Sequence, residues 1–394
     1  MKKSERDEYN KTYGLYKFKR PLPSEIESAM GLVDESILFK KLISADYERF
    51  YDPIKIPEEG DWLMTHKEFG QTYNEYIQND CYQVDPNHNV IYIHRFSSND
   101  DLIKDELFQN VIILLEAFFT GMKVYLYDEG TNYLNNNNEN DNENENNNNE
   151  NNNNNENNEN NNNNENNGEN NIENNNNMEN NVDNNNIIKN TQNEKMAINA
   201  DQLLEKLKLE MPEDAYCVFG IIDNDLYTES LSYNGKRLIK STYCKRSIQD
   251  RVAIFSLARF DPFFNFNGKI NNLSKEQKYK ISLILLKRIC NAITREICYM
   301  FGMKNCIFLS CCMNGTNVTE FDNKQIELCP ICLRKLVTNI KANGEDIKTY
   351  RVKKPLIVFN RFVKMRDALD NFAGIYENEI KWFDARIDFL KGLI

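Results

Sequence analysis

Four cysteines in the last third of the chain have the spacing of a metal site. Cys306, Cys311, Cys329 and Cys332 follow the pattern C-x4-C-x17-C-x2-C, and the second pair lies in the sequence CPIC. Four thiolates in two close pairs can surround one tetrahedral Zn²⁺ at about 2.3 Å each, which leaves no position for water or substrate. This Cys quartet therefore predicts one structural zinc that contributes to folding. Buried reduced thiols are the alternative.

The segment just before the quartet has a second pattern. Arg295, Glu296, Tyr299, Gly302 and Asn305 read R-E-x-x-Y-x-x-G-x-x-N. In zinc peptidases, an H-E-x-x-H helix carries two histidines four residues apart, with the general-base glutamate beside the first. An extended form of the motif turns at a glycine and returns a third histidine to the metal. The 295–305 segment keeps each of these spacings but contains no imidazole.

The residues at the three ligand positions are poor donors for zinc. The Arg295 guanidinium stays protonated and has no lone pair to offer. Tyr299 could bind only as a phenolate, and Asn305 only weakly through its amide oxygen. Without zinc, water keeps a pKa of about 15.7 rather than about 7, so the activated nucleophile and the Lewis acid are both lost. We therefore expect Glu296 to be a carboxylate paired with a nearby cation.

A long helix is predicted to position this segment. It begins after Ser274, because SKEQ forms a capping box with Gln277, and Gly302 is suited to end it. Its apolar residues recur at helical spacing. The predicted core face consists of Ile281, Leu285, Ile289, Ile293, Ile297 and Met300.

The rest of the ordered sequence predicts a mixture of strands and helices. Runs rich in β-branched and aromatic residues predict strands at 89–96, 122–128, 215–222 and 252–260. Helical spacing of apolar residues predicts helices at 102–121 and 203–211 and two more near the end of the chain. The last of these is marked by Ile380, Phe383, Ile387 and Leu390. The predicted fold class is α/β (α+β), a mixed sheet packed by helices.

An Asn- and Glu-rich stretch interrupts this pattern. Of the 60 acidic residues, 12 lie between positions 131 and 188, which contain no Lys or Arg, so the remainder has 48 acidic and 48 basic residues. Such a composition cannot bury a core and predicts a disordered surface insert. The predicted organisation is a charged extension (1–21), the first part of a domain (22–130), the insert (131–190) and the second part (191–394).

Composition also restricts the compartment and the partners. No run approaches the ~20 apolar residues of a membrane span, and the first residues lack the apolar core of a signal peptide. We expect a cytoplasmic or nuclear protein, in which ten cysteines indicate metal binding or burial rather than disulfides. The neutral balance outside the insert predicts no nucleic-acid partner and no membrane partner.

Residues 294–336 resemble the archaemetzincins, which are zinc metallopeptidases related to the metzincins. Other segments resemble animal members of the family: DWLMTHKEF (61–69), AFFTGMKVYLYD (117–128), PEDAYCVFGIIDNDLY (212–227) and VAIFSLARF (252–260). The resemblance covers about 45–130 and 197–394 and implies a metzincin-like fold.

The resemblance also implies a role for each matching residue. It places Glu296 at the general-base position, and Arg295, Tyr299 and Asn305 at the three positions of the catalytic zinc. It assigns the Cys quartet to a structural zinc and Met313 to the Met-turn. The three histidines, His66, His88 and His94, all precede the insert and are not expected to replace the lost ligands.

Three functions follow from these expectations. The leading hypothesis is a pseudopeptidase that keeps one structural zinc, has lost the catalytic zinc and binds a peptide or protein in the altered cleft. The alternative is an active, aminopeptidase-like metallopeptidase that acts on short peptides with non-standard ligands. A zinc-stabilised binding module is the third.

Overall fold

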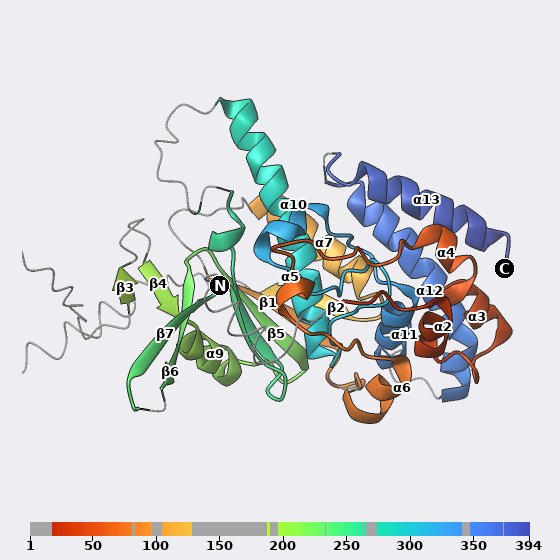
Figure 1. The fold of residues 1–394 in the computed structure, drawn as a ribbon, viewed down its shortest axis with the longest axis horizontal. Helices are drawn as coiled ribbons and strands as arrows, with labels where there is room; N and C mark the ends of the chain where they lie inside the picture. Colours follow the sequence, from red (N-terminus) through yellow and green to blue (C-terminus); the bar gives the residue numbers. More distant parts are fainter. Residues whose placement is uncertain are drawn as a thin grey trace, which may run out of the picture.

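The computed structural model describes residues 18–80, 83–96, 105–127, 187–189, 196–232, 234–262, 264, 274–340, 347–372 and 374–394 (Figure 1). Most of the predicted N-terminal extension and of the Asn-rich insert lies outside these residues. The boundaries proposed for those two segments therefore stay predictions.

A five-stranded mixed sheet forms the centre of the fold. Its strands lie in the order β2 (Lys123–Tyr127), β1 (Val90–Phe96), β5 (Ala215–Ile222), β9 (Val252–Ser256) and β8 (Cys244–Ser247). All neighbouring pairs are parallel except β8 with β9, so β8 is an antiparallel edge strand. Strands β5 and β9 are buried along their whole length, as expected for parallel strands covered on both faces. The predicted mixed α/β class is confirmed.

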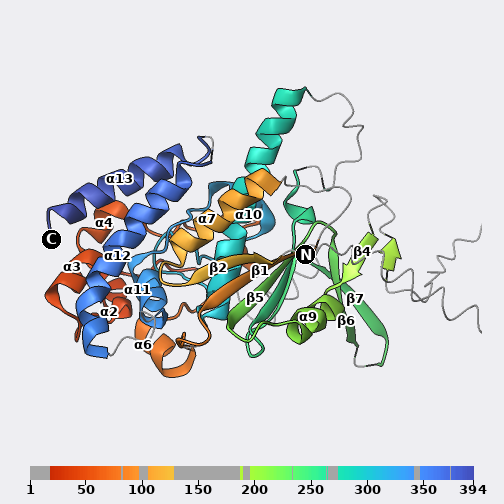
Figure 2. The same ribbon diagram turned by 180° about the vertical axis from the view of Figure 1, so that it is seen from behind.

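Helices cover both faces of this sheet. Helix α9 (Ala200–Leu209) packs with Val218 and Ile222 in one core cluster. Helices α7 (Asp105–Phe118) and α10 (Lys275–Met300) share the other cluster with Phe219 and Ile221 (Figure 2). Alternate residues of β5 thus serve two cores, which explains why its sequence is an uninterrupted apolar run.

The prediction of a strand over 252–260 was too long. Strand β9 ends at Ser256, and Ala258–Phe260 form the 3-10 turn η2. The hydroxyl of Ser256 causes the break, because it donates to the Asn224 carbonyl (2.7 Å) and accepts from the Ala258 N–H (3.2 Å). A side chain that bonds the nearby backbone competes with continued strand pairing.

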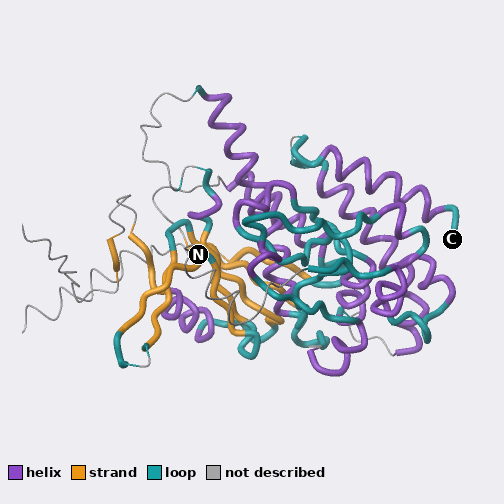
Figure 3. Tube along the Cα trace, viewed as in Figure 1, coloured by secondary structure: helices purple, strands orange, loops and turns teal. Residues whose placement is uncertain are grey.

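A second sheet lies beside the first. It contains β3 (Ile187–Lys189), β4 (Met196–Asn199), β6 (Leu226–Leu231) and β7 (Arg237–Thr242), in that order. Figure 3 shows the strands gathered toward one side of the molecule and most helices toward the other. The β6–β7 hairpin projects away from the helical side (Figure 1).

Short N-terminal helices and the C-terminal helices build the helical side. The first group is α2 (Pro23–Met30), α3 (Ile37–Ser44), α4 (Tyr47–Phe50), α5 (Trp62–Thr65) and α6 (Tyr73–Glu75), followed by the π-helical turn η1 (Tyr76–Asp80). The second group is the 3-10 turn η3 (Val318–Asn323), α11 (Pro330–Asn339), α12 (Ile347–Leu369) and α13 (Glu377–Lys391). The N-terminal helices were not predicted, because each is too short to show a hydrophobic period. The two C-terminal helices were, and Phe383, Ile387 and Leu390 are buried as expected.

Helix α10 has the predicted bounds. The Ser274 hydroxyl accepts the Gln277 N–H (3.2 Å), and Gln277 Oε1 accepts the Ser274 N–H (2.9 Å), so the capping box is present. At the other end Gly302 has φ +80° and donates its N–H to the Tyr299 carbonyl (3.0 Å). The left-handed conformation at Gly302 turns the chain back toward the last helical turn. A positive φ is unfavourable for residues with a Cβ, which explains why a glycine occupies this position.

One charged group joins the N-terminal helices to the C-terminal ones. The Glu35 carboxylate accepts from Lys354 Nζ (2.8 Å) and Arg334 Nη2 (3.1 Å). Burial alone would raise the pKa of Glu35, but hydrogen bonds and charge from Lys354 and Arg334 outweigh it and hold this pKa below its usual value. A depressed carboxyl pKa stabilises the fold above the unfolded-state pKa, and that stability disappears as the pH falls.

The Glu35→Gln variant should therefore lose about 1 kcal/mol of unfolding free energy at pH 7. It should also lose less further stability than the parent chain between about pH 5 and pH 3. Urea unfolding at several pH values measures both quantities. If the difference in unfolding free energy between the parent chain and Glu35→Gln stayed the same from about pH 5 to pH 3, the role of the ion pairs would be contradicted.

Candidate functional site

The four sulfurs of the Cys quartet converge on one point. Their Sγ atoms all lie within 4.8 Å of one another, and those of Cys306 and Cys329 are 3.7 Å apart. A tetrahedral zinc with Zn–S bonds of about 2.3 Å requires sulfurs roughly 3.8 Å apart. All four residues are buried. The geometry and the all-thiol donor set therefore fit a closed, structural zinc site.

Local structure explains how the sequence brings these sulfurs together. Cys329 is the N-cap of α11, Pro330 begins the helix, and Cys332 lies in its first turn. Proline is suited to a first helical position, and the positive end of the helix dipole favours thiolates. Cys311 Sγ accepts the N–H groups of Cys329 (3.2 Å) and Met313 (3.4 Å). These bonds orient a ligand sulfur from outside the metal shell.

The Asn314 side chain closes the loop that carries the first two cysteines. Its Nδ2 donates to the carbonyls of Cys306 and Leu309 (2.9 Å each), and its Oδ1 accepts the Cys311 N–H (2.8 Å). The amide thus satisfies three backbone groups in a loop that has no regular helix or sheet hydrogen bonds. The loop is shaped by protein contacts as well as by any metal.

The protonation of the quartet also favours a cation at its centre. Hydrogen bonds from the other three sulfurs lower the pKa of Cys306 well below the usual value. Burial and the neighbouring sulfurs raise the pKa of Cys329, and the neighbouring sulfurs with burial raise that of Cys332. Negative charge on one sulfur therefore opposes ionisation of the next. A divalent cation removes this opposition, because it stabilises all four thiolates at once.

The two other thiols near the quartet are packing residues. Cys298 and Cys312 are fully buried and are not part of the metal group. Burial raises the pKa of Cys312 to about 12 and that of Cys298 well above its usual value. Neutral, buried thiols of this kind are unreactive.

The 295–305 segment brings Arg295, Tyr299 and Asn305 together, as their spacing predicted. Arg295 Nε donates to the Tyr299 hydroxyl (3.0 Å), and Arg295 Nη2 lies 3.5 Å from Asn305 Oδ1. The Tyr299 hydroxyl in turn donates to Asn305 Oδ1. Arg295 is 3% exposed and Tyr299 7%. The three side chains are thus hydrogen-bonded to one another around a buried guanidinium.

Charges in this cluster favour a cationic arginine and a neutral phenol. Burial disfavours the charge of Arg295, but Tyr299 and Glu296 outweigh burial and raise the pKa of Arg295 above its usual value. Burial raises the pKa of Tyr299, although Arg295 opposes this effect. A phenolate ligand is therefore harder to form here than in water. The donor set does not fit a second divalent cation.

Two residues from the N-terminal half extend the network. Asn305 Nδ2 donates to Glu68 Oε1 (2.6 Å), and Trp62 Nε1 donates to the same oxygen (2.8 Å). The Trp62 indole lies directly on Gly315, where an added Cβ would approach it to 2.3 Å. We call residues 61–68 the strap, because this stretch connects the 295–305 segment to the loop after the first two cysteines. The sequence showed the strap only as a family-like stretch, and no spacing indicated its contacts.

Glu296 is buried and paired. It is 1% exposed, and its Oε2 forms an ion pair with Arg246 on the edge strand β8. The Cys244 thiol lies 3.3 Å from the same oxygen, and Arg295 Nη1 lies 4.0 Å from Oε1. The Arg246 guanidinium also lies over the Tyr299 ring, 4.1 Å from its centroid. The expected pairing of Glu296 with a cation is present, although the sequence did not identify Arg246 as the partner.

Replacing Arg246 by methionine should expose the cost of this buried carboxylate. The variant leaves Glu296 without its cation, and because Arg246 is partly exposed we expect a loss of about 1–3 kcal/mol of unfolding free energy. Arg237→Met is the matched control, since Arg237 pairs with Glu229 on an exposed hairpin, and it should cost much less unfolding free energy than Arg246→Met. Equal losses in urea unfolding of the two variants would contradict the inference.

Met313 is fully buried within residues 306–329, the stretch between the first and third cysteines of the quartet, which we call the zinc loop. Its carbonyl accepts the Cys306 N–H (2.8 Å), and its own N–H donates to Cys311 Sγ. Met313 thus lies next to the Cys quartet in the fold as well as in the sequence. Its role as a Met-turn stays a prediction.

The three histidines lie in other surroundings. His66 stacks on Trp62 (ring centroids 3.4 Å apart), His88 pairs with Asp85 in a turn (2.9 Å), and His94 is buried between Phe96 and Tyr127 on β1. Within the described part of the chain, the Cys quartet is the one group of three or more His, Cys, Asp or Glu residues with metal-binding spacing. The helices that the structure describes include none with the length and hydropathy of a membrane span.

Comparisons with known proteins agree with the resemblance. No protein-family model matches the chain. The chain is 28% identical to archaemetzincin-2 of Pongo abelii over 304 residues, which covers 73% of this chain and 69% of that protein. The human archaemetzincin-2 is 27% identical over the same length and coverage. Human archaemetzincin-1 is 28% identical over 162 residues, 36% of this chain and 31% of that protein.

Solved structures give a weaker likeness. The archaemetzincin of Methanopyrus kandleri aligns with a TM-score of 0.35 and 14% identity, covering 65% of this chain and 97% of that one. A zinc-dependent peptidase from Methanocorpusculum labreanum aligns with a TM-score of 0.36 and 16% identity, covering 62% and 99%.

The similarity to archaemetzincin-2 spans most of the chain. On this evidence the chain is similar to the archaemetzincins over most of its length, and its buried Cys quartet fits a structural zinc.

Proposed function

We propose that this protein is a pseudopeptidase, which keeps the structural zinc of the Cys quartet but holds no catalytic zinc. The observation that carries the proposal is the network formed by Arg295, Tyr299 and Asn305. A permanent cation is buried where the family resemblance places three metal ligands. A divalent metal at this position would face its positive charge at short range.

The surroundings of Glu296 support the same proposal. A general base must reach a water or substrate proton. Glu296 is instead buried, with an ion pair to Arg246 at one oxygen and Arg295 close to the other. Both oxygens thus face guanidinium groups, so the carboxylate contributes to the stability of this cluster rather than to proton transfer.

The structural zinc has a clear place in this proposal. We call Arg295, Tyr299 and Asn305 the altered site. Asn305 directly precedes Cys306, so a zinc in the quartet holds the chain at one end of this site. It also fixes the loop that ends at Gly315, on which Trp62 packs. The quartet would therefore keep the altered site in shape even though no metal acts there.

We also propose that residues 22–130 and 191–394 form one peptidase-like domain interrupted by the insert. The central sheet supports this division, since β1 and β2 precede the insert while β5, β8 and β9 follow it. A peptide or protein bound beside the altered site is the partner that such a fold suits.

Hydrolysis of a broad peptide library tests the proposal. We expect no cleavage above buffer by the zinc-loaded protein, and no difference between the parent chain and Glu296→Gln. Human archaemetzincin-2, assayed in parallel, serves as the family comparison. Cleavage that is lost with a chelator and in Glu296→Gln would overturn the proposal in favour of an active enzyme with non-standard ligands.

A further inference from the structure

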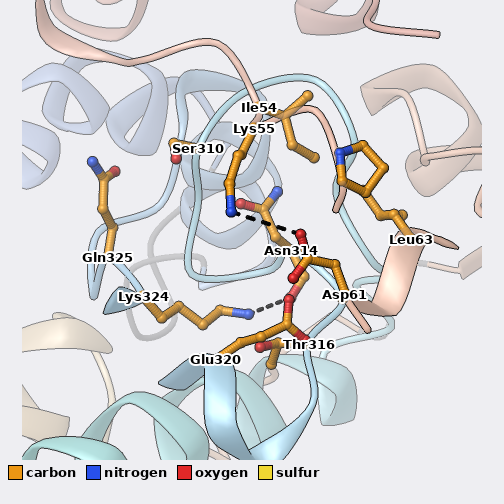
Figure 4. Close-up of a pocket in the computed structure, with 12 residues that line it drawn as sticks. Ile54, Lys55, Asp61, Leu63, Ser310, Asn314, Thr316, Glu320, Lys324 and Gln325 are labelled. Atoms are coloured by element: carbon orange, nitrogen blue, oxygen red, sulfur yellow. Dashed lines mark hydrogen bonds and ion pairs between the residues drawn. The ribbon is translucent and has the colours of Figure 1, made fainter. Parts of the chain in front are cut away.

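A pocket of about 270 Å³ lies where the start of the strap meets the zinc loop (Figure 4). Its lining comes from two stretches that are far apart in the sequence, 54–63 and 310–325. Gly315 lines the pocket and packs on Trp62, which shares Glu68 as a hydrogen-bond acceptor with Asn305. The pocket and the altered site are therefore neighbours. Arg295, Tyr299 and Asn305 do not line the pocket.

The pocket has an exposed mouth and a buried floor. Lys55 is exposed at the mouth, and Lys324 is only 8% exposed. Figure 4 shows the two lysines pointing toward the centre of the pocket from different sides. Ile54, Pro57 and Leu63 supply an apolar wall. A ligand would thus meet a cationic group at the floor and hydrocarbon along one side.

The acidic residues of the pocket already have other partners. Asp61 accepts the Glu58 N–H (2.7 Å) and lies 3.8 Å from Lys55 Nζ. Glu320 accepts the Asn317 N–H (2.5 Å) at the start of η3. Neither carboxylate forms an ion pair with Lys324 among the described residues. Among the described residues, Lys324 at the floor thus has no ion pair, although the charge of Glu320 acts on it from within the same pocket.

The surroundings of Lys324 make a neutralising anion favourable. Its Nζ donates to the Asn314 carbonyl, and an ammonium has three N–H donors. Burial lowers the pKa of Lys324 to about 7, and the nearby Arg295 charge acts in the same direction. A buried cation of this kind gains stability from a paired carboxylate.

We propose that this pocket binds an aliphatic carboxylate, with Lys324 as the anchor of the anion and Ile54, Pro57 and Leu63 as the contact for its hydrocarbon part. The volume of about 270 Å³ suits a small ligand group. A free short-chain acid and the C-terminal carboxylate of a peptide share this chemistry. The inference is separate from the proposed loss of the catalytic zinc, because Arg295, Tyr299 and Asn305 do not line the pocket.

Calorimetric titration of the full zinc-loaded chain tests the proposal with two matched pairs of probes. Butyrate is compared with butyramide, and N-acetyl-Ala-Val is compared with its C-terminal amide. We expect each acid to bind at least 10-fold more tightly than its amide. If N-acetyl-Ala-Val binds more tightly than butyrate, the ligand is the C-terminus of a peptide. If the two acids bind with equal affinity, the ligand is the small free acid.

Variants separate the anchor from general charge. Lys324→Met should reduce the affinity for the acids at least 10-fold, whereas Lys280→Met, an exposed lysine on α10, should leave it unchanged. Pro57→Trp is a second test, needed if Lys324→Met fails to fold. Its bulky side chain should fill the pocket from the rim and abolish binding of the acids. Equal binding of acids and amides, unaltered binding by Pro57→Trp, or no binding of any probe would overturn the inference.

Discussion

Replacing Cys329 by serine is expected to remove the zinc and to destabilise the protein strongly. Cys329 supplies one of four sulfurs and also caps α11, where its N–H bonds Cys311 Sγ. A three-thiolate site holds zinc far less tightly, and structural zinc contributes on the order of 10 kcal/mol in small modules. In this larger domain we expect a loss of several kcal/mol and a fall in Tm of more than about 10 °C. Metal analysis and calorimetry measure the two effects.

Cys312→Ala is the matched control for this prediction. Cys312 is as deeply buried as Cys329 but lies outside the metal group. It should keep one zinc per chain and lose only the stability of a small truncated side chain. Retention of zinc by Cys329→Ser, or equal destabilisation of the two variants, would contradict the assignment of the quartet.

Restoring histidines to the altered site should create a second zinc site. In the triple variant Arg295→His, Tyr299→His and Asn305→His, the buried guanidinium is gone and three imidazoles have the spacing of the extended peptidase motif. The backbone already turns at Gly302 and brings position 305 back to position 299. We expect two zincs per chain by metal analysis.

A second triple variant controls for the loss of the native side chains. Arg295→Met, Tyr299→Phe and Asn305→Leu removes the same hydrogen bonds without supplying ligands, so it should stay at one zinc. A folded histidine variant that also holds only one zinc would contradict the placement of these three positions around a former metal site. The histidine variant is not expected to hydrolyse peptides even with a second zinc, because Glu296, at the general-base position, still pairs with Arg246.

Much of this site could be predicted because it depends on local spacing. The quartet follows from two close cysteine pairs. The meeting of Arg295, Tyr299 and Asn305 follows from a helical repeat and one glycine turn. The bounds of α10 were also accessible, since the capping box and Gly302 are local signals.

The partners that complete the site depend on tertiary contacts and could not be predicted. Arg246 reaches Glu296 only because β8 pairs antiparallel at the edge of the sheet. Glu68 and Trp62 precede Asn305 by more than 230 residues and belong to a stretch without hydrophobic periodicity. Lys324 likewise becomes a pocket residue only when the strap lies across the zinc loop.

Zinc stoichiometry of the purified parent chain, combined with anomalous scattering at the zinc edge, tests the central claim most directly. We predict one zinc per chain and one anomalous peak, surrounded by the sulfurs of the Cys quartet. A second zinc per chain, with a peak between residues 295, 299 and 305, would contradict the claim.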